Sequence, residues 1–283
     1  MVAVTAIFAG CANDEDALLP NDSLKDTPIN VDVLVSGINT RAGYDNTSMP
    51  TMFYLSIDQK DTKYDYTNVV MKYEGDTWVA YESADKNAEK KQLLWEGSKD
   101  NVTVTAATFS LSDASTTLSV QTDQSTAEGI KASDHLYYYS NAVTPSIGGI
   151  SLGLDHIMSK ITVKLTLGTE YESSATNPIT SVTAFGASTD ATYSPGAGTP
   201  WSAVSNVSKI SLFPSVAYNK ADRTATYEAI LVPQTIAANT FGIEIRIGEQ
   251  TYEWTSADDF TLTGGTNHIL EMTVGNASSE NIN

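Results

Sequence analysis

The sequence contains one cysteine, three histidines and few basic residues. Because a single cysteine, Cys11, cannot form an internal disulfide, hydrophobic cores must stabilise the fold. Sixteen lysines and arginines stand against 34 aspartates and glutamates, which gives a formal net charge of −18. This charge repels the phosphate backbone of nucleic acids, so we expect no nucleic-acid partner.

Residues that could support catalysis or bind a metal are also sparse. The histidines His135, His156 and His268 are far apart, and none belongs to a metal-binding motif such as His-Glu-x-x-His. No serine lies in a Gly-x-Ser-x-Gly motif, and the acidic pair Asp258 and Asp259 is typical of a solvated loop. Folding can bring distant residues together, so spacing alone leaves a surface hydrolase open. We expect no enzyme, no metal and no cofactor.

The residues that are abundant favour strands. Thirty-five threonines and 14 tyrosines suit pleated, half-buried surfaces better than helices, and 41% hydrophobic residues are typical of a folded globular protein. Short apolar runs separated by turn residues predict an all-β chain built from sandwiches or barrels. A boundary near Asp155 would divide the chain into two comparable halves. The predicted strands are residues 52–57, 68–73, 78–81, 102–109, 135–139, 157–167, 179–185, 210–213, 225–232, 241–247, 251–254 and 269–274.

The N-terminus indicates export. Residues Val2 to Gly10 form a nine-residue apolar run, which suits a signal peptide and is too short to span a membrane. The segment Phe8-Ala9-Gly10-Cys11 resembles the lipobox of bacterial lipoproteins, although Phe8 replaces the usual leucine, and implies that the Cys11 thiol carries a lipid. The acidic residues that follow resemble a signal for the outer face of the outer membrane. The alternatives are a buried free thiol and a merely soluble tether.

A strand and a lone arginine follow this tether. The apolar residues Ile29, Val31, Val33 and Val35 alternate with polar ones or with Leu34, which predicts a strand with one buried face. Arg41, the first of three arginines, lies in a glycine-containing segment, residues 38–43, that we expect to be an accessible loop. An ordinary surface arginine is the alternative to a functional one.

Several motifs occur in the order typical of the fimbrillin family, the type V pilins of bacteroidete bacteria, and the chain resembles that family over nearly its whole length. They are Thr40-Arg41-Ala42, Leu93-Leu94-Trp95-Glu96-Gly97, Val102-Thr103-Val104-Thr105-Ala106, Ser133-Asp134-His135-Leu136-Tyr137-Tyr138, His156-Ile157-Met158-Ser159-Lys160, Leu231-Val232-Pro233-Gln234 and Gly264-Gly265-Thr266-Asn267-His268.

The resemblance implies two transthyretin-like β-sandwich domains in tandem, residues 42–155 and 156–283, after a removable segment 1–41. It implies an outer-membrane lipoprotein precursor that an arginine-specific protease cuts between Arg41 and Ala42. The loss of the strand carrying Ile29, Val31, Val33 and Val35 would open an apolar groove, and a strand of another pilin subunit would fill it. The product would be a cell-surface fimbrium that adheres to a host or bacterial ligand.

Three further features of the sequence concern the type of subunit and its contacts. The last nine residues, 275–283, are polar and lack alternating apolar anchors. Stalk pilins of the family carry a donor extension at this end, so the resemblance implies a tip or accessory subunit. His156 and Lys160 could contact other subunits, but structural roles at a strand edge are favoured. Alternatively, the aromatic residues would form exposed platforms of a glycan-binding surface lipoprotein; they are Trp78, Trp95, Tyr137, Tyr138, Tyr139, Trp201 and Trp254.

Overall fold

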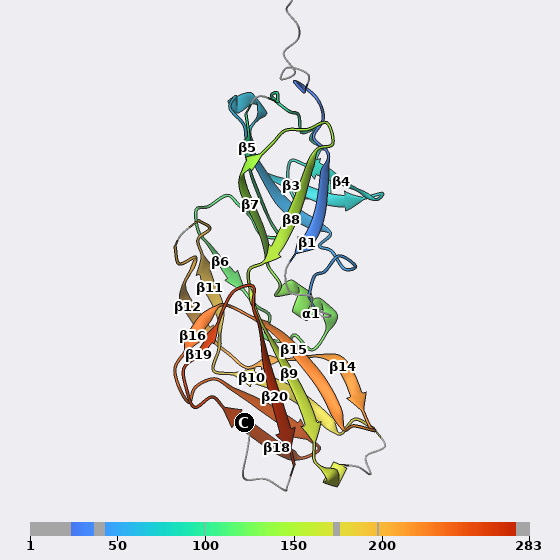
Figure 1. Cartoon of the computed structure of the whole chain (residues 1–283), viewed down its shortest axis with the longest axis vertical. Helices are drawn as coiled ribbons and strands as arrows, with labels where there is room; N and C mark the ends of the chain where they lie inside the picture. Colours follow the sequence, from blue (N-terminus) through green and yellow to red (C-terminus); the bar gives the residue numbers. More distant parts are fainter. Residues whose placement is uncertain (1–23, 37–42, 99, 172–175, 197, 276–283) are drawn as a thin grey trace, which may run out of the picture.

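A computed structural model describes residues 24–36, 43–98, 100–171, 176–196 and 198–275 (Figure 1). These residues form 20 strands, one short helix, α1 (Ala127–Ala132), and two single turns of 3₁₀ helix. The predicted all-β class is therefore confirmed. The strands are β1 (Val31–Ser36), β2 (Met52–Asp58), β3 (Tyr66–Glu74), β4 (Thr77–Tyr81), β5 (Val102–Ala107), β6 (Thr116–Ser119), β7 (Leu136–Val143), β8 (Ile150–His156), β9 (Ser159–Leu167), β10 (Ile179–Phe185), β11 (Ser188–Tyr193), β12 (Trp201–Val207), β13 (Ile210–Ser211), β14 (Phe213–Asn219), β15 (Thr224–Leu231), β16 (Gln234–Ile236), β17 (Gly242–Ile247), β18 (Gln250–Thr255), β19 (Phe260–Leu262) and β20 (Asn267–Val274).

The N-terminal half is built on one seven-stranded sheet in the order β1-β8-β7-β5-β2-β3-β4. Neighbouring strands are antiparallel except β1 and β8, which run parallel. Residues 90–95 bridge the two ends of this sheet, because Lys91 N donates to Ala80 O and Ile29 N donates to Leu93 O, both at 2.9 Å. The sheet therefore curls around a core that includes the fully buried Phe53, Trp95 and Leu152.

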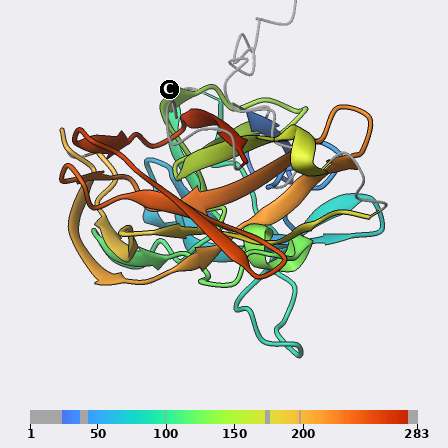
Figure 2. The same ribbon diagram turned by 90° about the horizontal axis from the view of Figure 1, so that it is seen from below.

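The C-terminal half packs two four-stranded sheets, β14-β15-β9-β20 and β13-β10-β17-β18, around a second core. Alternate residues of β9, such as Ile161 and Val163, meet alternate residues of β17, such as Ile243 and Ile245, in this core. Such alternation is the pattern of a β sandwich. Two smaller sheets, β12-β11-β6 and β16-β19, complete this half. The halves lie at opposite ends of an elongated molecule (Figure 1), and they overlap in the view from below (Figure 2).

One segment of the N-terminal half of the sequence belongs structurally with the second core. Strand β6 pairs with β11, and Ile130 of α1 is buried among residues of the C-terminal half. The buried amide of Gln124 accepts a hydrogen bond from Ile230 N at 2.8 Å and donates one to Ile230 O at 2.7 Å. The proposed division into residues 42–155 and 156–283 stays a prediction, and residues 116–132 cross it.

The described part of the chain also bears on membrane insertion. None of its helices is long and apolar enough to cross a membrane.

Candidate functional site

Strand β1 alternates between buried and exposed side chains. Val31, Val33 and Val35 point into the N-terminal core, while Asp32 and Leu34 face outward and Leu34 is 60% exposed. Ile29, just before the strand, is buried in the same core. Successive side chains of a strand point to opposite faces, so every second position is buried. The structure places the four predicted removable residues together on one face; their removal stays a prediction.

Among the strands that the structure describes, β1 pairs with a single neighbour. It runs parallel to β8, in the register Val31 to Ile150 through Ser36 to Asp155, and it forms the end of the sheet. The chains approach closely at Gly149, where φ is +88° and a Cβ atom would lie 2.2 Å from Asn30 O. Only glycine permits this approach, so Gly149 helps to define where β1 begins.

The residues preceding β1 form a second row of contacts that the sequence did not reveal. Asp26 N donates to Trp95 O, and Trp95 N donates to Thr27 O, both at 2.9 Å. Leu24 is also buried in the N-terminal core, and the fully buried Trp95 donates its indole N–H to Ser146 O at 3.0 Å. The segment that would be removed therefore contributes Leu24 to the core in addition to the four predicted residues.

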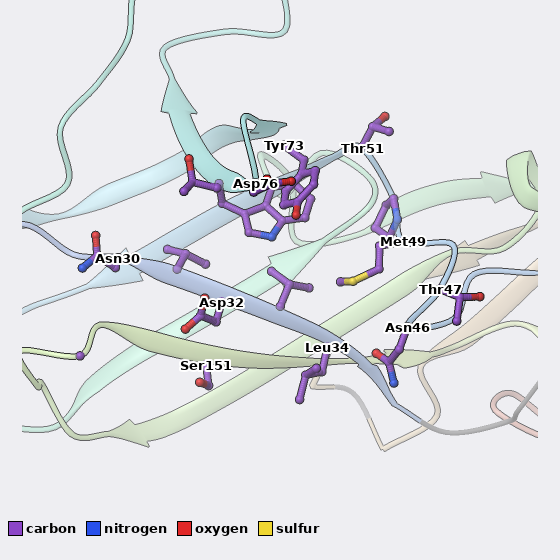
Figure 3. Close-up of a pocket in the computed structure, with 16 residues that line it drawn as sticks. Asn30, Asp32, Leu34, Asn46, Thr47, Met49, Thr51, Tyr73, Asp76 and Ser151 are labelled. Atoms are coloured by element: carbon purple, nitrogen blue, oxygen red, sulfur yellow. The ribbon is translucent and has the colours of Figure 1, made fainter.

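A cleft of about 890 Å³ runs along the free edge of β1, between this strand and the β3–β4 hairpin. Figure 3 shows Asp32 and Leu34 on one side of the cleft, Tyr73 on the other, and Met49 and Asn46 at one end. The side-chain oxygen Oδ1 of Asn46 accepts a hydrogen bond from Val35 N at 2.9 Å. Asn46 thus occupies a place at this edge that a neighbouring strand would otherwise take.

The chain is fixed again shortly after the predicted cleavage point. Tyr44 N donates to Oδ2 of Asp134 at 2.8 Å, and Oδ1 of Asp134 lies 2.8 Å from Nδ1 of His156. Both Asp134 and His156 are buried. Arg41, Ala42 and Cys11 lie outside the described residues. The segment from Tyr44 onward is therefore held by contacts that do not involve β1.

Lys160 makes a buried ion pair instead of a surface contact. Its Nζ atom lies 2.9 Å from Oε1 of Glu228, and both side chains are more than nine-tenths buried. Burial lowers the pKa of Lys160 from its ordinary value, and the Glu228 carboxylate opposes this shift. The geometry of Lys160 and His156 favours the structural roles over subunit contacts.

The aromatic residues that could form glycan platforms pack mainly on one another and on the cores. Trp95 is fully buried, and the rings of Tyr193 and Trp201 meet at 48°. The two nearly parallel ring pairs, Phe109 with Tyr137 and Phe241 with Phe260, each contain a buried phenylalanine. Tyr139 is 56% exposed. These arrangements favour core roles for the aromatic residues over an open platform.

Within the described ranges, no group of three or more His, Cys, Asp or Glu side chains is arranged to hold a metal ion. The edge strand β1 and the cleft beside it are the main features of this candidate site. The family model of fimbrillin-like proteins matches residues 30–283. The chain belongs to the fimbrillin-like family. None of the curated proteins that were compared with the chain matches it.

Solved structures share this fold at low sequence identity. A candidate cell-adhesion protein from Bacteroides ovatus aligns with a TM-score of 0.62 and 15% identity over 90% of this chain and 94% of its own. A candidate cell-adhesion protein from Bacteroides uniformis aligns with a TM-score of 0.54 and 12% identity over 88% of this chain and 93% of its own. At these identities the likeness concerns the fold alone. The β-sandwich class predicted from the sequence is therefore confirmed.

Proposed function

We propose that this fimbrillin-like chain is a structural subunit of fimbriae that assembles by exchanging β1 for a strand of another subunit. The proposal rests on how β1 is held in the sheet. It fills a core with Val31, Val33 and Val35, yet among the described residues it pairs with one strand, β8, and its other edge is bonded to the Asn46 side chain. A strand held in this way can be withdrawn without breaking any other strand pairing in the sheet.

The groove left by β1 would favour binding of another strand. Withdrawal would expose the inner face of the groove and the β8 ladder to water, where unpaired strand edges and apolar surface invite association. Each large apolar side chain contributes about 1.5 to 3 kcal/mol when fully buried. An incoming strand with apolar side chains at alternate positions recovers this free energy and the main-chain hydrogen bonds, which is β-strand addition.

The maturation steps of the proposal rest on the resemblance of the segment at Cys11 to a lipobox and of the segment at Arg41 to the family's processing site. Lipidation at Cys11 anchors the precursor in the outer membrane, and an arginine-specific protease cuts after Arg41. Because Cys11 and β1 lie on the same side of that cut, the lipid leaves with the strand, and neighbouring subunits then hold the mature chain on the cell surface. Tyr44 supports this order, since its link to Asp134 keeps the new N-terminal segment in place. The tip or accessory position and the adhesion ligand stay predictions.

Substitution of Arg41 tests the processing step. The Arg41→Ala variant is expected to accumulate as a full-length lipoprotein that does not enter fimbriae. Arg246→Ala is the matched control, since it removes an arginine that pairs with Glu244 on β17, far from the cut along the chain. N-terminal sequencing of subunits from assembled fimbriae should find Ala42 first. Normal fimbriae from Arg41→Ala, or another first residue, would refute the step.

A further inference from the structure

The outer edge of β1 shows an asymmetry that bears on which strand can replace it. In a parallel ladder, the N–H and C=O groups of one residue point to the same neighbour, and successive residues alternate. Ile150 N donates to Asn30 O at 2.8 Å, so Asn30 and the even-numbered residues of β1 face β8. Val31, Val33 and Val35 therefore point their main-chain groups toward the cleft.

One of these three N–H groups has a fixed acceptor. Asn46 Oδ1 accepts a hydrogen bond from the N–H of Val35, at the end of β1 nearest the predicted cut in the sequence. Among the described residues, no protein atom accepts the N–H of Val31 or Val33, and both residues line the cleft. The N–H of Val35 at this edge is therefore capped by Asn46, whereas the N–H groups of Val31 and Val33 face the open cleft.

Asn46 is held in place by contacts that do not depend on β1. It lies in a turn in which Thr47 N donates to Oδ1 of Asp45 at 2.7 Å and Ser48 N donates to Asp45 O at 3.1 Å. Tyr44 N is bonded to the buried Asp134 before this turn. Asn46 lies beyond Arg41 in sequence, so it stays with the subunit when β1 leaves.

From this arrangement we propose that Asn46 binds the main-chain N–H of the replacing strand at the position of Val35 and so disfavours a residue that lacks this N–H there. The inference rests on the proposed strand exchange and names the class of partner. That partner is an extended segment with apolar residues at the positions of Val31, Val33 and Val35 and a free amide at the last of them. Proline or an N-methylated residue is disfavoured there and tolerated at the Val33 position, whose amide faces the open cleft.

Strand exchange into the cut precursor tests this selection. The full chain is cut after Arg41, which leaves β1 bound without a covalent link, and fluorescent peptides with the sequence of residues 24–36 then compete for the groove. The peptides are unmodified, N-methylated at Val35, or N-methylated at Val33. The proteins are the natural chain, Asn46→Ala, and Asn46→Asp, which keeps an acceptor oxygen.

The natural chain should bind the peptide methylated at Val35 roughly threefold to tenfold more weakly than the unmodified peptide, the range expected for one hydrogen bond. The peptide methylated at Val33 should bind within about twofold of the unmodified one. The discrimination should disappear in Asn46→Ala and return in Asn46→Asp. Equal discrimination in the natural chain and Asn46→Ala would overturn the role of Asn46. Failure of even the unmodified peptide to exchange would overturn strand exchange, and this inference with it.

Hydrogen exchange on the uncut chain gives an independent readout of the cap. The Val35 amide should exchange roughly tenfold more slowly than the Val33 amide, because hydrogen-bonded amides are protected. Asn46→Ala should remove this difference and leave the amides of Asp32 and Leu34, which face β8, unchanged. Equal rates for Val33 and Val35 in the natural chain would overturn the inference.

Discussion

The ammonium group of Lys160 lies 2.9 Å from a carboxylate oxygen of Glu228, and the two buried side chains extend from neighbouring strands, β9 and β15. The second carboxylate oxygen of Glu228 is buried with no hydrogen-bond partner among the described residues. Each charge is therefore compensated mainly by the other. Burial lowers the pKa of Lys160, which shows that the environment disfavours its charged form.

Removal of one partner should therefore cost more than removal of both. Lys160→Met leaves the Glu228 carboxylate buried and unpaired, and we expect it to reduce the free energy of unfolding by about 3 to 5 kcal/mol. The double variant Lys160→Met with Glu228→Leu should lose clearly less, because two apolar side chains replace the pair. Urea unfolding of the natural chain and these variants measures the difference. A double variant as unstable as the single one would contradict this account of the pair.

Gly149 should control the docking of β1. In Gly149→Ala the new Cβ atom would lie 2.2 Å from Asn30 O, at a φ of +88° that disfavours other residues. We expect the start of β1 to move away from β8, with faster hydrogen exchange at Asp32 and Leu34. Gly75→Ala is the matched control, since Gly75 also has a positive φ, +54°, but open space around its Cβ position. Gly75→Ala should cost about 1 to 2 kcal/mol of local strain and leave the β1 amides unaffected. Equal effects of the two variants on β1 would show that the close approach is unimportant.

The two faces of β1 should respond differently to truncation. Val33→Ala removes buried methyl groups and should reduce the free energy of unfolding by about 1 to 3 kcal/mol. Leu34→Ala removes more atoms from the next residue, but Leu34 is 60% exposed, so its effect should stay within about 0.5 kcal/mol. Urea unfolding measures the free energies of unfolding of the two variants. When the chain has been cut after Arg41, Val33→Ala should also release β1 faster than the natural chain does. A larger effect of Leu34→Ala would contradict the assignment of the faces.

Indole fluorescence should report the departure of β1. Trp95 is fully buried and exchanges two main-chain hydrogen bonds with residues 26 and 27 of the removable segment. Release of that segment should move water toward Trp95 and shift its emission to longer wavelength. Trp95→Phe should abolish most of this change, whereas Trp254→Phe, which alters a partly buried ring of the C-terminal half, should preserve it. An emission shift that persists in Trp95→Phe would show that another tryptophan reports the release of β1, which would contradict this prediction.

The sequence predicted which side chains of β1 are buried, but it did not predict the strand with which the main chain of β1 pairs. Alternation is local, so Val31, Val33 and Val35 indicated a strand with one buried face. The parallel pairing with β8 joins distant segments, and nothing near Val31 specifies Ile150 as its partner. Strand β8 itself repeats the same signal at Ile150, Leu152 and Leu154, and it could have been predicted from the sequence.

Other elements lack a readable pattern for physical reasons. Strand β12 is exposed at nearly every position, so no apolar period marks it. Gln124 lies in a polar stretch typical of a loop, yet its buried amide bonds to both main-chain groups of Ile230. Asn46 likewise resembles an ordinary turn residue, because its role depends on where Val35 N points. Side-chain to backbone contacts of this kind follow from the tertiary fold and leave no local signature.

His135 should make the stability of the chain depend on pH. Burial lowers the pKa of His135 below its ordinary value of 6.5, and its Nε2 atom lies 3.1 Å from Ser119 O. Below pH 6.5 the unfolded chain therefore binds a proton more readily than the folded chain, so the free energy of unfolding should fall as pH decreases through that value and toward the folded pKa. His135→Gln keeps a donor for Ser119 O but does not titrate, so urea unfolding at about pH 7.5 and about pH 5 should show a smaller loss in the variant. An NMR titration of the His135 ring that gives a pKa at or above the ordinary value would contradict this prediction.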